Sequence, residues 1–503
     1  MATQIKSGGP PTSAPATDTS FFGHPRGLAT LFFTEMWERF SYYGMRALLI
    51  LFMTAGTATG GLGFPVAKAG AIYGFYTAMV YLLSLPGGWV ADRIFGQRRA
   101  VLYGGVLISA GQFALMSPAI GGFYAGLGLL ILGTGLLKPN VSTIVGQLYA
   151  QGDRRRDPAF SIFYMGINLG GLLAPLACGW VGQRINWRLG FGLAGVGMIV
   201  GLIQYTLGAK HLGSAGLHPT PPATPEAARR LKRNIALAAI AAALIFAALG
   251  GLAFTGAIEI TAQRISAALG IALIAVSIAI FGWLLAGRGW SPVERKRSAA
   301  ILVLFLASAA FWASYEQGGS SLNLFAERNT HDALFGFNFP ASWFQFLPSF
   351  FVMILAPIFA WLWIALGKRE PSSPSKFASG LIFGGIAFGL LVIPAKAAVA
   401  GALVSPFWLT ATYFLQTAGE MCLSPVGLSA MTKLAPARVA GMMMGLWFVS
   451  ISIGDYLSGI AASVYESMPL PSLFGLVATV SLAAAIVLAV LVRPTVKLMS
   501  GVK

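Results

Sequence analysis

Residues 34–46 place charged side chains inside a segment that is otherwise apolar enough to cross a membrane. The polar positions recur at steps of three and four, so on a helix they form one stripe along a single face. The stripe consists of Glu35, Glu38, Arg39, Tyr42, Tyr43 and Arg46. Two carboxylates one turn apart compete for the same guanidinium, so protonation of either acid would release or tighten its hold on Arg39. The pattern predicts a group that binds and releases protons within the membrane.

Eight ionisable side chains lie deep inside apolar segments. They are Glu35, Glu38, Arg39, Arg46, Lys138, Glu316, Glu420 and Asp455. Each costs about 2.5–3.5 kcal/mol at the centre of a bilayer, so such residues usually face an aqueous cavity or one another. Five of these residues are acids and three are bases. An acid without a fixed cation in a low-dielectric setting can take up a proton near neutral pH. Asp455 is the acid for which no partner is predicted.

Depth along the predicted spans matches two of the bases with two of the acids. Arg46 and Glu316 lie at similar depth toward the outside of the membrane, whereas Lys138 and Glu420 lie toward the inside. Each pair joins the N-terminal half of the chain to the C-terminal half. We interpret the pairs as an outer gate and an inner gate, and the alternative is that they only hold helices together.

The composition is that of a membrane protein with many spans. Of the 503 residues, 56% are hydrophobic and 10% are charged, and the mean hydropathy is +0.74. Soluble globular proteins carry about 25% charged residues. Apolar runs such as 234–254 and 472–492 are long enough to cross about 30 Å of hydrocarbon. A soluble multidomain protein is therefore excluded.

Fourteen apolar segments are predicted to span the membrane as helices. They cover residues 27–53, 69–91, 99–118, 121–147, 158–182, 187–208, 231–254, 265–286, 298–326, 341–366, 376–397, 404–434, 438–463 and 471–492. If both termini are cytoplasmic, most of the 34 Lys and Arg residues lie in inner loops, as the positive-inside rule requires. Membrane orientation thus explains the net charge of +18, and no nucleic-acid partner is expected.

The spans divide around a long loop that is rich in Pro and Ala. We predict a disordered tail at 1–24, a six-helix bundle at 25–210, a linker with an inserted two-helix hairpin at 211–297, a second six-helix bundle at 298–494 and a tail at 495–503. Two six-helix bundles are typical of all-α transporters built from related halves. The loop GGWVADRIFGQRR at 87–99 resembles the signature of the major facilitator superfamily.

The spans contain no pattern of a hydrolytic or metal-dependent active site. All four histidines lie in tails or loops, at His24, His211, His218 and His331. Neither a Ser/His arrangement nor a pair of aspartates occurs within the spans. Cys178 and Cys422 stand alone in apolar segments, where inert buried thiols are expected. We expect no enzyme, no metal site and no cofactor, with protons as the co-substrate.

Four motifs in matching order resemble one branch of the major facilitator superfamily. E-x-x-E-R-F-S-Y-Y-G at 35–44 resembles the first-helix motif of the proton-dependent oligopeptide transporters. The likeness recurs in FYMGINLGG at 163–171, FWASYEQ at 311–317 and GEMCLSPVGLS at 419–429. The resemblance implies that residues 231–286 correspond to the extra helical pair of bacterial members.

The resemblance also implies roles for individual residues. Arg39 and Lys138 would hold the substrate carboxylate and Glu420 the free amino group, so the site would measure the length of a zwitterionic peptide. Asn168 resembles the position that hydrogen-bonds the peptide backbone. Side-chain pockets would be lined by Tyr43, Tyr81, Trp312 and Trp447. For each aromatic residue taken alone, ordinary helix packing is the stronger alternative.

The chain departs from the family pattern at QFLPSF, residues 345–350. Many members have a Ser and an Asn before a proline here, whereas Phe346 and Pro348 occupy those places in this chain. An Asn that could contact the peptide is therefore missing. We expect the departure to affect peptide preference rather than the mode of transport.

Together these features predict a proton-coupled symporter that imports di- and tripeptides by alternating access. Proton coupling is assigned to Glu35, Glu38, Arg39 and Glu316. We expect a monomer in a bacterial inner membrane with both termini in the cytoplasm. Two alternatives stay open: transport of another anionic or zwitterionic solute, such as nitrate or an amino-acid conjugate, and a receptor that binds peptides without moving them.

Overall fold

Long helices follow from the apolar composition, because backbone groups inside a bilayer must be bonded within their own segment. The computed structural model describes residues 18–150, 152–220, 259–334 and 336–501, with isolated positions between 224 and 255. In these ranges the only strands are β1 (Ala333–Leu334) and β2 (Phe337–Asn338), which pair antiparallel. The prediction of an all-α protein is confirmed.

The helices on each side of the central linker are as follows. The first half contains α1 (Arg26–Thr54), α2 (Val66–Leu82), α3 (Ser84–Val90), α4 (Gln97–Leu115), α5 (Ile120–Gln147), α6 (Arg156–Trp180) and α7 (Trp187–Gly208). The second half contains α10 (Pro292–Tyr315), α11 (Ser321–Asn329), α12 (Leu347–Leu366), α13 (Ser373–Val399), α14 (Pro406–Leu434), α15 (Ala440–Ser463) and α16 (Leu470–Leu498). Between them lies α9 (Ala262–Ala286).

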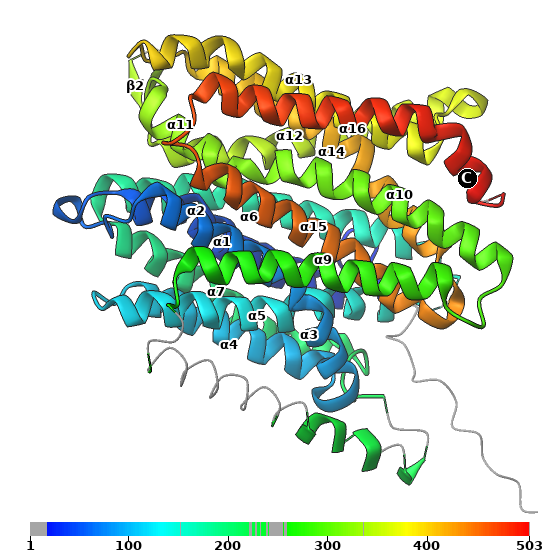
Figure 1. Ribbon diagram of the computed structural model, residues 1–503. Helices are drawn as coiled ribbons and strands as arrows, with labels where there is room; N and C mark the ends of the chain where they lie inside the picture. Colours follow the sequence, from blue (N-terminus) through cyan, green and yellow to red (C-terminus); the bar gives the residue numbers. More distant parts are fainter. Residues whose placement is uncertain are drawn as a thin grey trace, which may run out of the picture.

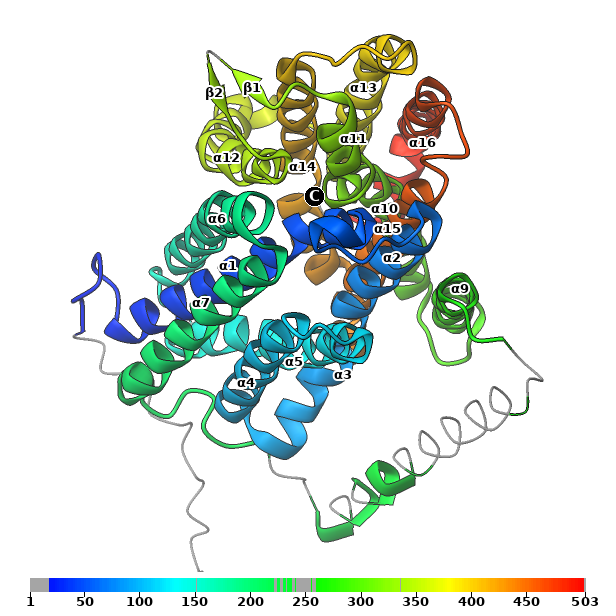
Figure 2. The same ribbon diagram turned by 90° about the vertical axis from the view of Figure 1, so that its left-hand side faces the viewer.

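The helices run side by side, and both ends of the described chain lie at the same end of the bundle (Figure 1). We call this the termini end and the opposite one the far end. Seen end-on, α1 and α4–α7 gather on one side and α10–α14 and α16 on the other (Figure 2). Between these groups α2 packs against α15, and α6 packs against α12. The grouping agrees with two bundles, whose sequence boundaries stay a prediction.

Helix α9 is the second helix of the predicted hairpin. It begins at Ala262 and ends at Ala286, close to the predicted span 265–286. The helix packs against α2, α10 and α15, so it lies over the junction of the two bundles. The first helix of the hairpin, predicted at 231–254, lies mostly outside the described residues.

Most of the described helices can cross a membrane. Ten helical segments in the described residues are long and apolar enough to do so. Helices α1 and α14 have 29 residues each, which also exceeds the roughly 20 residues that a span requires. These two are less apolar because they carry Glu35, Glu38, Arg39, Arg46 and Glu420. The length and composition of the helices agree with a multi-pass membrane protein.

The predicted span 298–326 is not continuous. Helix α10 ends at Tyr315, and Glu316–Gly319 form a 3-10 turn, here called η5, before α11 begins. The run Gly-Gly-Ser-Ser at 318–321 has low helix propensity, which explains the break. The predicted span lies within a single apolar segment, Pro292–Asn329, that is long enough to cross a membrane. The turn within it brings Glu316 to Arg46 of the other half.

Helices α2 and α15 approach each other through glycines. A Cβ atom at Gly74 would lie 2.8 Å from the Cα of Gly459, and one at Gly70 would lie 2.8 Å from the carbonyl oxygen of Gly459. Both contacts are to backbone atoms, which cannot move aside as a side chain can. The absence of side chains at these positions therefore allows α2 and α15 to approach this closely.

The segment before α1 is held by an imidazole–phenol contact. Nδ1 of His24 lies 2.9 Å from the hydroxyl oxygen of Tyr149. Burial and the nearby Arg155 lower the pKa of His24, and burial raises the pKa of Tyr149 to about 12. The neutral form of the imidazole is therefore the form that fits this contact.

We expect Gly459→Ala to destabilise the protein, because its methyl group would overlap the Cα atom of Gly74. Overpacking of this kind costs about 1–3 kcal/mol, which should lower the melting temperature of the detergent-solubilised protein. Gly128→Ala is the matched control, since a Cβ there meets nothing within 4 Å. Equal melting temperatures for the two variants would contradict the close-packing argument.

We expect acid to loosen the segment before α1. The pKa of folded His24 lies below the unfolded value of about 6.5, so its contact with Tyr149 contributes stability above that value. This contribution is lost as the pH falls through the lowered pKa. Hydrogen exchange at residues 20–25 should therefore rise on acidification in the wild type. In Tyr149→Phe the exchange should already be fast at neutral pH, and a slow variant would contradict the assignment.

Candidate functional site

The acids of α1 share one guanidinium. Nε of Arg39 lies 3.1 Å from Oε1 of Glu35 and 2.5 Å from Oε2 of Glu38. All three side chains are buried, and Oε2 of Glu35, Oε1 of Glu38 and Nη2 of Arg39 have no hydrogen-bond partner among the described residues. With both acids ionised the cluster would carry one unbalanced negative charge, which is unfavourable in a dry interior. The cluster is neutral when it holds one proton.

Arg46 and Glu316 join the two bundles. Nη2 of Arg46 lies 2.5 Å from Oε2 of Glu316, and Nε of Arg46 donates a hydrogen bond of 2.8 Å to the hydroxyl of Tyr73. The side-chain amide of Asn323 adds a bond of 2.9 Å to the carbonyl oxygen of Ala47. The structure thus brings together Arg46 and Glu316, which the sequence analysis paired by their similar depth in the membrane. Their role as a gate stays a proposal.

Gly319 makes room for this pair. A Cβ atom at Gly319 would overlap the hydroxyl of Tyr73 and would lie 2.7 Å from Nε of Arg46. The turn that ends α10 therefore needs a glycine on the side that faces α1 and α2. Gln345, which precedes α12, also contacts this turn. Its side-chain amide donates to the carbonyl oxygen of Gly318 and, over 3.0 Å, to the hydroxyl of Tyr413.

Further polar contacts close the far end of the bundle. The amide of Gln183 donates to Oε2 of Glu327 over 2.8 Å, and its oxygen accepts from the backbone N–H of Ser342 over 2.8 Å. Arg184 lies 3.5 Å from Asp332. Sequence reasoning missed Gln183, because a single glutamine at the end of a span carries no signal of its partners. The far end is closed by several contacts in addition to the Arg46–Glu316 pair.

The predicted pair of Lys138 and Glu420 is not formed in this conformation, and its role as an inner gate stays a prediction. Nζ of Lys138 lies over the ring of Tyr81, 3.5 Å from its centroid. Oε2 of Glu420 accepts a hydrogen bond of 2.5 Å from the hydroxyl of Tyr315. Tyr81 belongs to the same half as Lys138, and Tyr315 to the same half as Glu420. With the far end closed, each residue is held within its own bundle.

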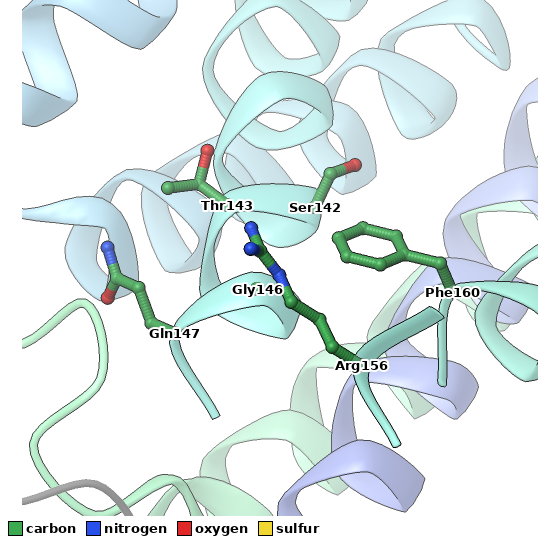
Figure 3. A pocket seen from close by; sticks show the side chains of 6 residues that line it. All are labelled: Ser142, Thr143, Gly146, Gln147, Arg156 and Phe160. Carbon is green, nitrogen blue, oxygen red and sulfur yellow. The ribbon is translucent and has the colours of Figure 1, made fainter. Parts of the chain in front are cut away.

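A cavity of about 430 Å³ opens toward the termini end, between α5 and α6. It is lined by Ser142, Thr143, Gly146, Gln147, Arg156 and Phe160. Arg156 extends from the start of α6 towards α5, with Phe160 beside it (Figure 3). Gly146 lies eight residues beyond Lys138 on α5, which is about 12 Å along the helix. The cavity therefore lies between Lys138 and the termini end.

The remaining predicted residues are placed as follows. Tyr43 packs edge-on against Tyr42, and the amide of Asn168 donates to the carbonyl oxygen of Tyr164 over 2.9 Å. Trp312 packs edge-on against Tyr315, with centroids 5.3 Å apart, and so lies next to the residue that holds Glu420. The ring of Trp447 is 3% exposed and packs against Phe377 of its own bundle. Trp447 thus has a packing role, and its place in a substrate pocket is untested.

The departure at 345–350 leads from a 3-10 turn into α12. Residues Ala341–Phe346 form the turn, and Pro348 lies in the first turn of α12, where a missing N–H costs nothing. Phe346 packs edge-on against Phe350. The polar residue of this stretch that faces the other bundle is Ser349, since a Cβ at Gly171 of α6 would overlap its hydroxyl.

Comparison with known proteins decides the family. A family model described as the POT family matches residues 98–476. The chain belongs to the POT family. The peptide transporter YePEPT of Yersinia enterocolitica subsp. palearctica is 39% identical, over 97% of this chain and 98% of the relative. The di-/tripeptide transporter of Lactococcus lactis subsp. cremoris is 38% identical, over 97% of this chain and 99% of the relative.

Solved structures of the POT family share the fold. A crystal structure of a peptide transporter POT in complex with sulfate matches with a TM-score of 0.92 and 44% identity, over 97% of this chain and 99% of the other. The family consists of membrane transporters with the major-facilitator arrangement, and it is not a family of enzymes. The predictions of family and fold class are confirmed.

We expect Glu316→Gln to weaken closure of the far end, because Arg46 would then be buried without a counter-charge. Loss of one partner of a buried pair costs about 3–5 kcal/mol. Hydrogen bonds that the glutamine keeps would reduce this cost. Pulsed electron paramagnetic resonance between spin labels at Thr59 and His331, one on each half, should report a longer distance.

Glu466→Gln is the matched control for this experiment. It removes the partner of Arg328 at 2.7 Å, but that pair is partly exposed and at the surface, where such pairs contribute little. Its label distance should equal that of the wild type. An unchanged distance in Glu316→Gln as well would mean that Arg46 and Glu316 do not hold the far end closed.

Proposed function

We propose that this POT-family chain is a proton-coupled symporter that imports di- and tripeptides across a bacterial inner membrane. The observation that carries the proposal is the sharing of Arg39 by two buried acids, with a second cation, Lys138, that lies over an aromatic ring. Glu420, in the other bundle, accepts a hydrogen bond from a phenol. Two cations and one acid suit the two charged ends of a zwitterionic peptide.

Peptide binding would replace weak partners by strong ones. The ring of Tyr81 attracts an ammonium group by about 0.5–2 kcal/mol, whereas a peptide carboxylate would bring a full opposite charge to Lys138. The peptide ammonium would likewise give Glu420 a charged partner in place of the hydroxyl of Tyr315. A substrate that has two charged ends is therefore favoured over one that has a single charged end.

Proton uptake would be linked to binding through Arg39. A peptide carboxylate that approaches Arg39 competes with Glu35 and Glu38 for its guanidinium. The acid that is displaced is left in a dry site without a cation, and it is favoured to take up a proton. Binding of the peptide carboxylate to Arg39 would thus be linked to uptake of a proton by Glu35 or Glu38, which is a physical basis for symport.

Release of the far end would complete the cycle. Protonation of Glu316 would remove the charge that holds Arg46, so the far end could open to the outside. In the conformation described, that end is closed and the cavity between α5 and α6 lies on the other side of Lys138. The positive-inside rule assigns the termini end to the cytoplasm. A peptide released there would have been imported, and a single chain is proposed to suffice.

We expect an acid-outside pH gradient to drive accumulation of dialanine in proteoliposomes. Lys138→Ala and Glu420→Gln should each lower this accumulation by roughly tenfold or more, equivalent to about 1.4 kcal/mol of lost stabilisation. Lys210→Ala is the control, because it removes an exposed lysine at the termini end. Unchanged accumulation in both site variants would remove the site assignment.

The same assay separates the alternative functions. Accumulation that does not respond to the pH gradient would indicate a facilitator, and binding without accumulation would indicate a receptor. Accumulation of nitrate or of an amino-acid conjugate, without accumulation of dialanine, would indicate transport of another solute. Each of these results would replace the proposal of peptide symport.

A further inference from the structure

Asp455 is a fully buried acid that the cycle proposed above does not use. It lies in the middle of α15 with 0% of its surface exposed, and neither carboxylate oxygen has a hydrogen-bond partner among the described residues. Thr77 of α2 lies beside it, but the hydroxyl of Thr77 donates to the carbonyl oxygen of Tyr73 over 2.9 Å. An ionised carboxylate in such a place is very unfavourable, whereas a protonated one carries no charge.

Asp455 lies where α15 meets both α2 and the turn η5. The preceding residue, Gly454, is packed so tightly that a Cβ atom there would overlap the side chain of Trp312, one turn before Glu316. One turn further along α15, the hydroxyl of Ser458 lies 3.0 Å from that of Ser320, which directly follows η5. A shift of either α2 or η5 relative to α15 would therefore change the surroundings of Asp455.

The titratable groups around Asp455 come from four elements. They are Tyr42 and Arg46 of α1, Tyr73 and Tyr81 of α2, Glu316 of η5 and Lys138 of α5. The two cations among them already have partners, since Arg46 is paired with Glu316 and Lys138 lies over Tyr81. Asp455 would gain Arg46 as a partner when Glu316 becomes neutral and releases it.

We propose that Asp455 is a further proton-binding residue of the transport cycle, and that it exchanges its proton with Glu316. While Arg46 is paired with Glu316, Asp455 is protonated and neutral. When the proton passes from Asp455 to Glu316, Arg46 loses one carboxylate partner and gains the other, so the charge of the cluster stays the same. The Arg46–Glu316 contact can then break without leaving a buried guanidinium uncompensated. This inference rests on the proposed proton-coupled transport.

The test compares net transport with exchange in Asp455→Asn. Asparagine imitates the protonated acid in shape but cannot release a proton. In proteoliposomes we expect accumulation driven by a pH gradient to fall at least tenfold, while exchange of internal for external dialanine at equal pH stays within twofold of the wild type. Asp455→Glu, which keeps a titratable group, should recover part of the accumulation. Ser452→Ala, a fully buried non-titratable position on the same helix, should behave as the wild type.

The outcomes decide between coupling and packing. Wild-type accumulation and pH profile in Asp455→Asn would overturn the proposal, and so would equal loss of exchange and accumulation in a folded variant, because that result indicates a packing role. A wild-type protein that shows no gradient-driven accumulation would instead refute the proposed function on which the inference rests. The two failures are therefore distinguishable.

A spectroscopic measurement keeps the proposal testable if Asp455→Asn does not fold. The infrared spectrum of the wild-type protein at neutral pH should contain a carbonyl band of a protonated carboxyl group that shifts in Asp455→Glu. The band should weaken when Glu316→Gln leaves Arg46 available to Asp455. A band that neither variant affects would show that Asp455 is not the group that holds the proton.

Discussion

A buried ion pair joins the two halves of the protein. Arg46 belongs to the first bundle and Glu316 to the second, and their side chains meet at 2.5 Å in a site from which water is largely excluded. The turn η5, the glycine at 319 and the hydroxyl of Tyr73 all accommodate this contact. An unpaired charge in such a site is unfavourable, which is why we propose the pair as a gate.

The same constraint of charge neutrality links the other buried groups. The α1 cluster holds two acids on one guanidinium, and it is balanced only with a proton. Lys138 and Glu420, which face neither each other nor any other charge at contact distance, are held by an aromatic ring and a phenol. These neutral contacts are weaker than an ion pair, and on this we base the proposal of a ligand that supplies both charges.

Much of this could be predicted from the sequence because it depends on local properties. An apolar run of sufficient length must be a helix in lipid, and a charge within such a run is costly wherever the helix packs. The spans, the buried acids and bases, and the motifs that resemble the POT family were therefore visible in the order of the residues. The depth argument also predicted the contact of Arg46 with Glu316, because depth along a span is fixed by residue spacing.

What only the tertiary structure decided is which side chains meet in a given conformation. Sequence depth predicted Lys138 with Glu420 as readily as Arg46 with Glu316, yet in this conformation Lys138 lies over Tyr81 and Glu420 accepts from Tyr315. The partners of Gln183 and Gln345, the break at η5 and the isolation of Asp455 likewise depend on helices that are far apart in the chain. Composition and spacing determined that buried charges exist and at what depth they lie. Helix packing determined which of them are neutralised by another charge and which must be neutralised by a proton.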